Sequence, residues 1–168
     1  MKSIINYIYE KLNSFNVWIM CGLPGSGKST YIKKNLPKNI EIINQDQIRV
    51  ELGIMNNINK KKIGNSEQEK EVRKINFERI DNCINNRKDF IVDNTNIKSG
   101  YVQNLYDRLK KVGADVKIII IDTPIEICKE RRKNDIPAKV LDDMQLGIDK
   151  VKKKFSKNKD TEIINNSY

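Results

Sequence analysis

A glycine-rich segment near the start of the chain has the residue types needed to hold phosphate groups. Gly22 is followed after four residues by Gly27, Lys28 and Ser29, which is the spacing of a phosphate-binding loop. Such glycines let backbone N–H groups turn toward phosphate oxygens, and a helix beginning near Lys28 adds the positive end of its dipole. The lysine then bridges the β- and γ-phosphates, and the serine hydroxyl completes a Mg²⁺ shell. We expect ATP, with Mg²⁺ on Ser29, to bind Gly22, Leu23, Pro24, Gly25, Ser26, Gly27, Lys28, Ser29 and Thr30.

Two charged residues, Asp46 and Arg49, follow the second apolar run of the chain. The carboxyl ends of parallel strands open onto one crevice, so Asp46 is expected to face the same cleft as the glycine-rich loop. A carboxylate there can accept the proton of an attacking hydroxyl, and a neighbouring guanidinium can bind a phosphate of the acceptor. The alternative is that Asp46 caps a helix and Arg49 is its surface ion-pair partner. Spacing alone does not decide between the two.

The run Asp93-Asn94-Thr95-Asn96 ends the third apolar stretch. Its position at the end of a strand places it at the mouth of the same cleft. Asn and Asp also make turns for purely structural reasons, which is the competing interpretation. We expect Asp93, Asn94 and Thr95 to contribute to acceptor binding.

A basic run, residues 129–133, precedes Asp135-Ile136-Pro137. It is expected to lie between two helices, in a lid over residues 125–137. An arginine there, Arg131 or Arg132, could neutralise charge on a phosphoryl group in transfer. The competing interpretation is a solvated helix end favoured by the helix dipole.

The elements that must position these residues alternate between apolar runs and amphipathic stretches, which is typical of an α/β fold with a parallel sheet. We predict a single domain over residues 1–168, with about four central parallel strands flanked by helices and a helical lid. Capping boxes are expected at Ser66 and Glu69 and at Thr123 and Glu126. The predicted strands are 17–21, 40–43, 90–92 and 116–121. The predicted helices are 1–15, 28–36, 46–52, one that begins at residue 66, one over 102–112 that ends at Gly113, and one that begins at residue 137. Residues 53–65 are predicted to form a loop and residues 156–168 a frayed tail.

Composition narrows the class of protein. The chain of 168 residues has a formal charge of +10, which is compatible with a polyanionic partner. It contains no histidine, so a general base must be a carboxylate, a lysine or a tyrosine. The three cysteines form no CxxC pair, which argues against a disulfide framework or a zinc site. No apolar run is long enough to cross a bilayer, and a cytoplasmic location with no membrane partner is expected.

Taken together, the segments GLPGSGKST, NQDQIR, VDNTN and ERRKNDIPAKV resemble the 5′-polynucleotide kinase family over residues 16–155. The resemblance implies a P-loop kinase fold and transfer of the ATP γ-phosphate to the 5′-hydroxyl end of DNA or RNA. It also implies that Asp46 activates the hydroxyl, that Arg49 binds the acceptor phosphate with support from Asp93, Asn94 and Thr95, and that Arg131 or Arg132 is the lid arginine. Lys28 and Ser29 match the phosphate and metal positions.

The sequence departs from that family in three respects. Gln45 stands where an arginine is common, and the two lid arginines are adjacent rather than several residues apart. Phosphatase and ligase motifs, which are often fused to such kinases, are missing, so a repair pathway would need separate proteins for these steps. Two alternatives stay open: a P-loop kinase of a small molecule, nucleotide-sugar or tRNA, resembling zeta toxins, and a nucleic-acid-binding module driven by nucleoside triphosphate without transfer activity.

Overall fold

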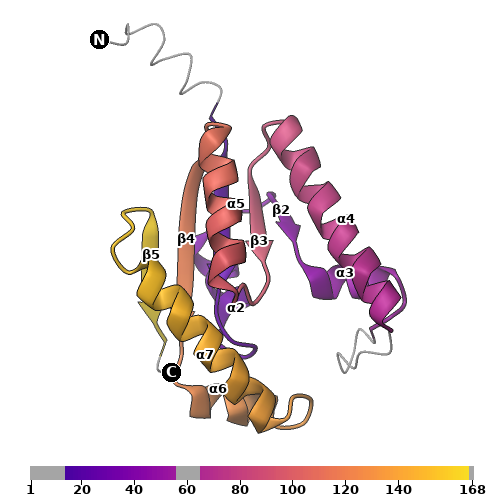
Figure 1. Ribbon diagram of the computed structural model, residues 1–168, viewed down its shortest axis with the longest axis vertical. Coiled ribbons are helices and arrows are strands. Elements are labelled where there is room, and N and C mark those ends of the chain that lie inside the picture. Colours follow the sequence, from indigo (N-terminus) through magenta and orange to yellow (C-terminus); the bar gives the residue numbers. More distant parts are fainter. Residues whose placement is uncertain (1–13, 56–64, 167–168) are drawn as a thin grey trace, which may run out of the picture.

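The computed structural model of the chain describes residues 14–55 and 65–166 (Figure 1). Most of the helix predicted over 1–15, and residues 56–64 of the predicted loop, lie outside the described residues. Ser14 and Phe15 are described, and they lead into the first strand without helical structure. None of the helices in the described ranges combines the length and hydropathy needed to cross a membrane.

Five strands form one parallel sheet, so the predicted α/β fold is confirmed and gains a strand. In chain order the strands are β1 (Asn16–Cys21), β2 (Glu41–Ile43), β3 (Phe90–Asp93), β4 (Asp115–Asp122) and β5 (Thr161–Asn165). Their order across the sheet is β2-β3-β1-β4-β5, and each neighbouring pair is parallel. β1 therefore lies in the centre, where its continuous apolar run is buried from both faces.

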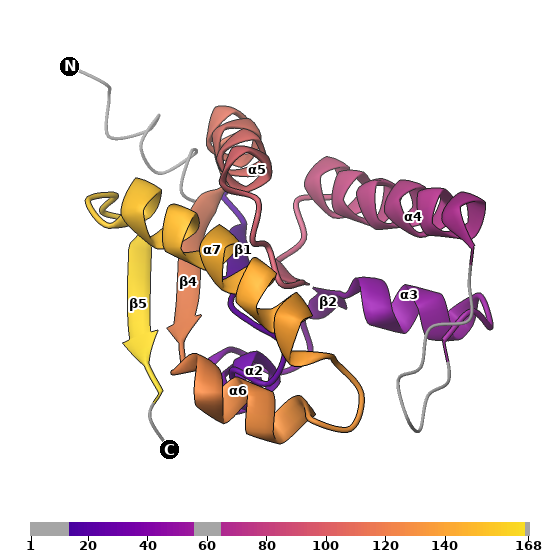
Figure 2. The ribbon, with the colours of Figure 1, turned by 60° about the horizontal axis from the view of Figure 1, so that its bottom comes forward.

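Helices cover both faces of this sheet (Figure 2). They are α2 (Lys28–Asn35), α3 (Gln45–Glu51), α4 (Ser66–Asn85), α5 (Ser99–Lys111), α6 (Ile125–Arg132) and α7 (Ala138–Phe155). Side chains of α4, α5 and α7 pack against one face in the larger core, whereas α2 packs Ile32 against Met20, Ile91 and Ile119 on the other. The loops at the carboxyl ends of the strands are left uncovered by these layers.

The predicted frayed tail is wrong for residues 161–165, which form β5 beside β4. This edge strand buries little apolar surface, and Ile163 is 38% exposed. Its backbone pairing with β4, rather than a hydrophobic pattern, holds it in the sheet. Beyond the strand, the Asn166 backbone N–H donates to the Asp122 carbonyl at 2.9 Å, so the chain stays attached up to that residue.

Both predicted capping boxes need correction. Asn65, not Ser66, caps α4, and the Gln68 side chain completes the box by accepting from the Asn65 backbone N–H. At α6 the cap residue is Pro124, without a side-chain cap, and the Thr123 hydroxyl instead donates to the Ser26 carbonyl at 2.7 Å. The basic run is also not between two helices, because it lies mostly within the last turns of α6.

Candidate nucleotide and acceptor site

The glycine-rich loop connects buried β1 to α2 and is held in place by the strands beside it. Gly27 adopts a left-handed φ of 98° at the N-cap of α2, a conformation that favours glycine. The Ser26 carbonyl accepts hydrogen bonds from Thr123 and from the Asn166 side chain, both at 2.7 Å. These two contacts tie the loop to the carboxyl ends of β4 and β5.

Lys28 begins α2 and turns back over the loop. Its Nζ donates to the carbonyl oxygens of Gly22 at 2.9 Å and Leu23 at 3.0 Å. Burial lowers the pKa of Lys28, and the nearby carboxylates of Asp93 and, more weakly, Asp46 oppose that shift. The lysine therefore lies in the field of both predicted acidic residues.

A single cavity of about 1360 Å³ brings most of the predicted residues together. Three predicted residues do not line the cavity: Leu23 and Ser26, which are buried, and Gly22. The predicted residues that do are Pro24, Gly25, Gly27, Lys28, Ser29, Thr30, Asp46, Arg49, Asp93, Asn94, Thr95, Arg131 and Arg132.

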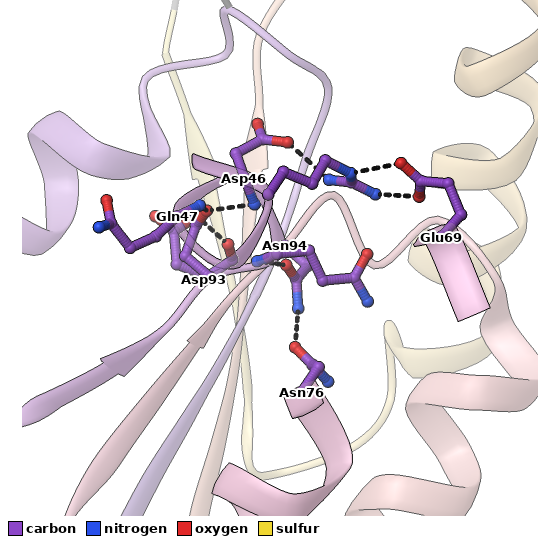
Figure 3. A network of polar contacts seen from close by, with 9 residues as sticks. Asp46, Gln47, Glu69, Asn76, Asp93 and Asn94 are labelled. Atoms are coloured by element: carbon purple, nitrogen blue, oxygen red, sulfur yellow. Dashed lines mark hydrogen bonds and ion pairs between the residues drawn. The ribbon is translucent and has the colours of Figure 1, made fainter. Parts of the chain in front are cut away.

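Asp46 and Arg49 form an ion pair on the first turns of α3 (Figure 3). Arg49 Nη1 donates to Asp46 Oδ1 at 2.7 Å, while its Nε and Nη2 donate to the two carboxylate oxygens of Glu69, both at 2.8 Å. Asp46 does not cap the helix, since the cap is Asn44, whose side-chain oxygen accepts from the Asp46 and Gln47 backbone N–H groups. Nor is Arg49 a surface residue, because it is only 7% exposed.

The Asp93-Asn94-Thr95-Asn96 run makes hydrogen bonds to both the start of α3 and the glycine-rich loop. The Asn44 side chain donates to the Asp93 carbonyl at 2.6 Å, and the Asn94 side chain accepts from the Gln45 backbone N–H at 2.9 Å. On the other side, the Thr95 carbonyl accepts from the Gly22 N–H at 3.0 Å. The run thus has the structural role that its Asn and Asp residues indicate, and three of its residues, Asp93, Asn94 and Thr95, also line the cavity.

Asp93 is the buried acid of this run, with 6% of its surface exposed. Burial raises the pKa of Asp93 above its ordinary value, and the positive charge of Lys28 and a hydrogen bond from Asn44 only partly offset that effect. Among the carboxylates, Asp93 is the one whose charge acts most strongly on Lys28.

The two lid arginines have different partners. Arg131 Nη1 donates to the Gly25 carbonyl at 2.8 Å, so it contacts the phosphate-binding loop directly. Arg132 pairs with Asp135 at 2.8 Å. Gly25 has a φ of +82°, and a Cβ there would come within 2.9 Å of Arg132 Cγ. Glycine at this position therefore allows α6 to approach the loop.

Several cavity residues were missed by sequence reasoning. Asn166 lines the cavity and follows a strand that was not predicted. Glu69 does not line the cavity but holds Arg49, and it lies on a helix whose position over α3 the sequence does not show. The apolar residues of the lining, Met55, Ile136, Val140 and Met144, were also not predicted as site residues. For Val140 and Met144 the sequence does carry a signal, because both lie on the apolar stripe of α7 together with the buried residues Ile148 and Val151.

Several solved structures share the fold of this chain at low sequence identity. A Pnkp1/Rnl/Hen1 complex matches with 23% identity and a TM-score of 0.53, over 74% of this chain and 40% of that one. The AvrRxo1-ORF1:-ORF2 structure with ATP matches with 15% identity and a TM-score of 0.65, over 89% of this chain and 54% of that one. A gluconokinase from Sinorhizobium meliloti matches with 14% identity and a TM-score of 0.56, over 89% and 82% of the two chains.

The chain thus spans only about half, or less, of the first two of these proteins. No curated protein matches it. The profile of the AAA domain family AAA_33, in contrast, matches residues 17–150, from β1 into α7. That range includes the phosphate-binding loop, the Asp46–Arg49 pair, the Asp93 run and the lid. The chain therefore belongs to the AAA_33 family of AAA domains, and its fold is that of the P-loop kinases.

Proposed function

We propose that this protein is an ATP-dependent polynucleotide kinase that transfers the γ-phosphate to the 5′-hydroxyl end of DNA or RNA. The observation that carries the proposal is that Asp46, Arg49 and the Lys28 loop line one cavity. A phosphoryl donor and an acceptor hydroxyl could therefore meet in it. Phosphoryl transfer asks mainly for alignment and charge neutralisation, which this set of side chains can supply.

On the donor side, the loop N–H groups and the N-terminus of α2 would hold the triphosphate. Lys28 would leave its backbone carbonyl partners for the β- and γ-phosphate oxygens, which are stronger acceptors because they are charged. Arg131, already on the Gly25 carbonyl, is better placed than Arg132 to reach the transferred group. The Arg132–Asp135 pair would instead stabilise the end of the lid.

The residues around Lys28 also suit Mg²⁺, which prefers oxygen ligands and keeps several of its waters. Ser29 is exposed at the cavity and would provide a hydroxyl ligand, and the Asp93 and Asp46 carboxylates lie near enough to Lys28 to interact with it electrostatically. Bound Mg²⁺ would supply positive charge to the phosphate oxygens.

On the acceptor side, Asp46 is the residue proposed to take the proton from the attacking hydroxyl. Its side chain is 54% exposed, so a substrate can reach it, and Arg49 holds one of its oxygens. The guanidinium, which lines the cavity, is also proposed to bind the acceptor phosphate. With Asn94 and Thr95 nearby, this end of the cavity offers both charge and hydrogen bonds.

Apolar side chains in the cavity lining favour a nucleic-acid acceptor over a sugar. Met55, Ile136, Val140 and Met144 line the cavity together, and such side chains pack well against the flat face of a nucleobase. A sugar offers hydroxyl groups that these side chains cannot satisfy. The net charge of +10 also favours a polyanionic acceptor. If the protein acts in repair, the phosphatase and ligase steps would fall to partner proteins.

The test is an acceptor panel with γ-labelled ATP and Mg²⁺. Matched DNA and RNA oligonucleotides with a 5′-hydroxyl are compared with the same strands carrying a 5′-phosphate, and with nucleosides, gluconate and nucleotide-sugars. We expect label only on 5′-hydroxyl strands, and its loss in Lys28→Ala. Label on gluconate or a nucleotide-sugar would support the small-molecule alternative, whereas binding of oligonucleotide without transfer to any acceptor would support the non-catalytic one.

A further inference from the structure

The buried Arg49 guanidinium is held from two sides by carboxylates on different helices. Glu69, in the first turn of α4, accepts from Arg49 Nε and Nη2 in a bidentate pair, and Asp46 on α3 accepts from Nη1 (Figure 3). The exposed fractions are 9% for the Arg49 side chain, 24% for Glu69 and 54% for Asp46. The buried Arg49 guanidinium therefore links the half-buried Glu69 to Asp46, whose carboxylate is exposed at the cavity.

We infer that Glu69 is a positioning residue for the transfer reaction: it fixes Arg49, and Arg49 in turn fixes the Asp46 carboxylate toward the acceptor. The inference rests on the proposed function of Asp46. It assigns a role in the reaction to α4, a helix that contributes no predicted site residue.

The bidentate geometry explains why Glu69 can do this. A carboxylate that accepts from Nε and Nη2 together fixes the plane of the guanidinium, because that edge has two parallel donors. Nη1, on the opposite side of the group, is then held in the same plane, where it donates to Asp46 Oδ1. An arginine held by one partner alone would keep several of its rotamers.

Electrostatics support the same arrangement. Burial alone would lower the pKa of Arg49, but hydrogen bonds and charge from Glu69, followed by those from Asp46, outweigh burial and raise it. The guanidinium therefore stays charged in a largely buried position. Without the Glu69 charge, Asp46 would be the only carboxylate of this triad left to pair with Arg49, and we expect the guanidinium to turn toward it. The base would then be neutralised by its own neighbour.

Helix α4 makes a second contact with the same end of the site. Asn94 Nδ2 donates to the Asn76 side-chain oxygen at 3.3 Å, and Asn76 is buried two turns beyond Glu69 on α4. Glu69 and Asn76 are seven residues apart, so they lie on one face of the helix. This face points at α3 and at the Asp93 run, which is the arrangement expected of a supporting element.

The test compares Glu69→Gln with Glu67→Gln. Glu67 has the same charge in the same turn of α4 but is exposed, so its loss changes the helix dipole interaction equally without touching Arg49. We expect Glu69→Gln to lower kcat on the best acceptor of the wild type by on the order of ten- to a hundred-fold, with KM for ATP unchanged. Glu67→Gln should stay within twofold of the wild type.

A double substitution separates positioning from folding. In an Arg49→Lys background the bidentate pair cannot form, so adding Glu69→Gln should lower kcat by less than twofold further if Glu69 acts through Arg49. A full additional loss, or a kcat for Glu69→Gln equal to that of Glu67→Gln, would overturn the inference.

A measurement without any acceptor distinguishes failure of this inference from failure of the proposed function. The Arg49 Nε–H signal should be resolved by NMR and exchange slowly with solvent in the wild type and in Glu67→Gln. In Glu69→Gln it should exchange at least ten-fold faster. If no acceptor in the panel is phosphorylated, this result still tests whether Glu69 fixes Arg49, and equal exchange in all three proteins would overturn it.

Discussion

Asp93 illustrates how a side chain at the site is held at a cost to stability. It ends a fully buried strand, its carboxylate is almost inaccessible, and its hydrogen-bond partner Asn44 is itself the cap of α3. An ionised carboxylate in such a position loses most of its hydration, and Lys28 returns only part of that free energy. The benefit is a fixed negative charge beside the lysine that is proposed to hold phosphate.

Replacing this residue should therefore separate stability from activity. The pKa of Asp93 is raised in the folded protein, so the ionised form destabilises the fold at every pH above the unfolded-state value of about 3.9. Asp93→Asn should unfold at a higher temperature than the wild type at pH 7. This advantage should shrink as the pH falls through the raised folded-state pKa of Asp93 and should be lost below about 3.9, where the carboxyl is protonated in both states. Thermal unfolding of both proteins across this pH range measures the effect. A lower melting temperature for Asp93→Asn at pH 7 would show that the pair with Lys28 outweighs burial.

Among the elements, the strands and helices with strong patterns were predictable and the edge of the sheet was not. β1 and β4 are continuous apolar runs, and α5 has apolar residues at helical spacing, so their type follows from local sequence. β5 has no such signal in its sequence, because the strand forms through backbone pairing with β4. The cap of α4 differed from prediction because Asn65, next to Ser66, accepts the N–H groups of the first turn. At α6 the predicted cap residue Thr123 instead donates to the Ser26 carbonyl, a contact between distant segments that local sequence does not show.

The packing of α7 on the segment before α5 can be tested with two glycines. A Cβ at Gly147 of α7 would lie 2.8 Å from the Ile97 carbonyl oxygen and 3.0 Å from Ile97 Cβ, so the helix would have to move away. Gly147→Ala should destabilise the protein by about 1–3 kcal/mol. Gly100→Ala in α5 meets no atom within 4 Å, and it should stabilise by roughly 0.5–1 kcal/mol because alanine favours helix. Urea unfolding measures both; equal effects would contradict the close packing.

In the whole molecule, the site is a meeting point of segments that are far apart in the sequence. The rule that parallel strands present their carboxyl ends at one edge was enough to bring Lys28, Asp46 and Asp93 together, because each follows a recognisable strand. No such rule places Glu69, Met144 or Asn166, since their positions depend on how α4, α7 and β5 pack against the rest. The sequence could thus predict the charged groups of the cavity, while the residues that support and shape it required the fold.

The central claim is that Asp46 serves as the base for a hydroxyl bound opposite the Lys28 loop. The most direct test is the rate of γ-phosphate transfer to a 5′-hydroxyl oligonucleotide by Asp46→Asn, together with its affinity for ATP. We expect transfer to fall by about two to four orders of magnitude, the usual contribution of a general base, while ATP binding is largely retained. Transfer at the wild-type rate by this variant, with the same ATP affinity, would contradict the account.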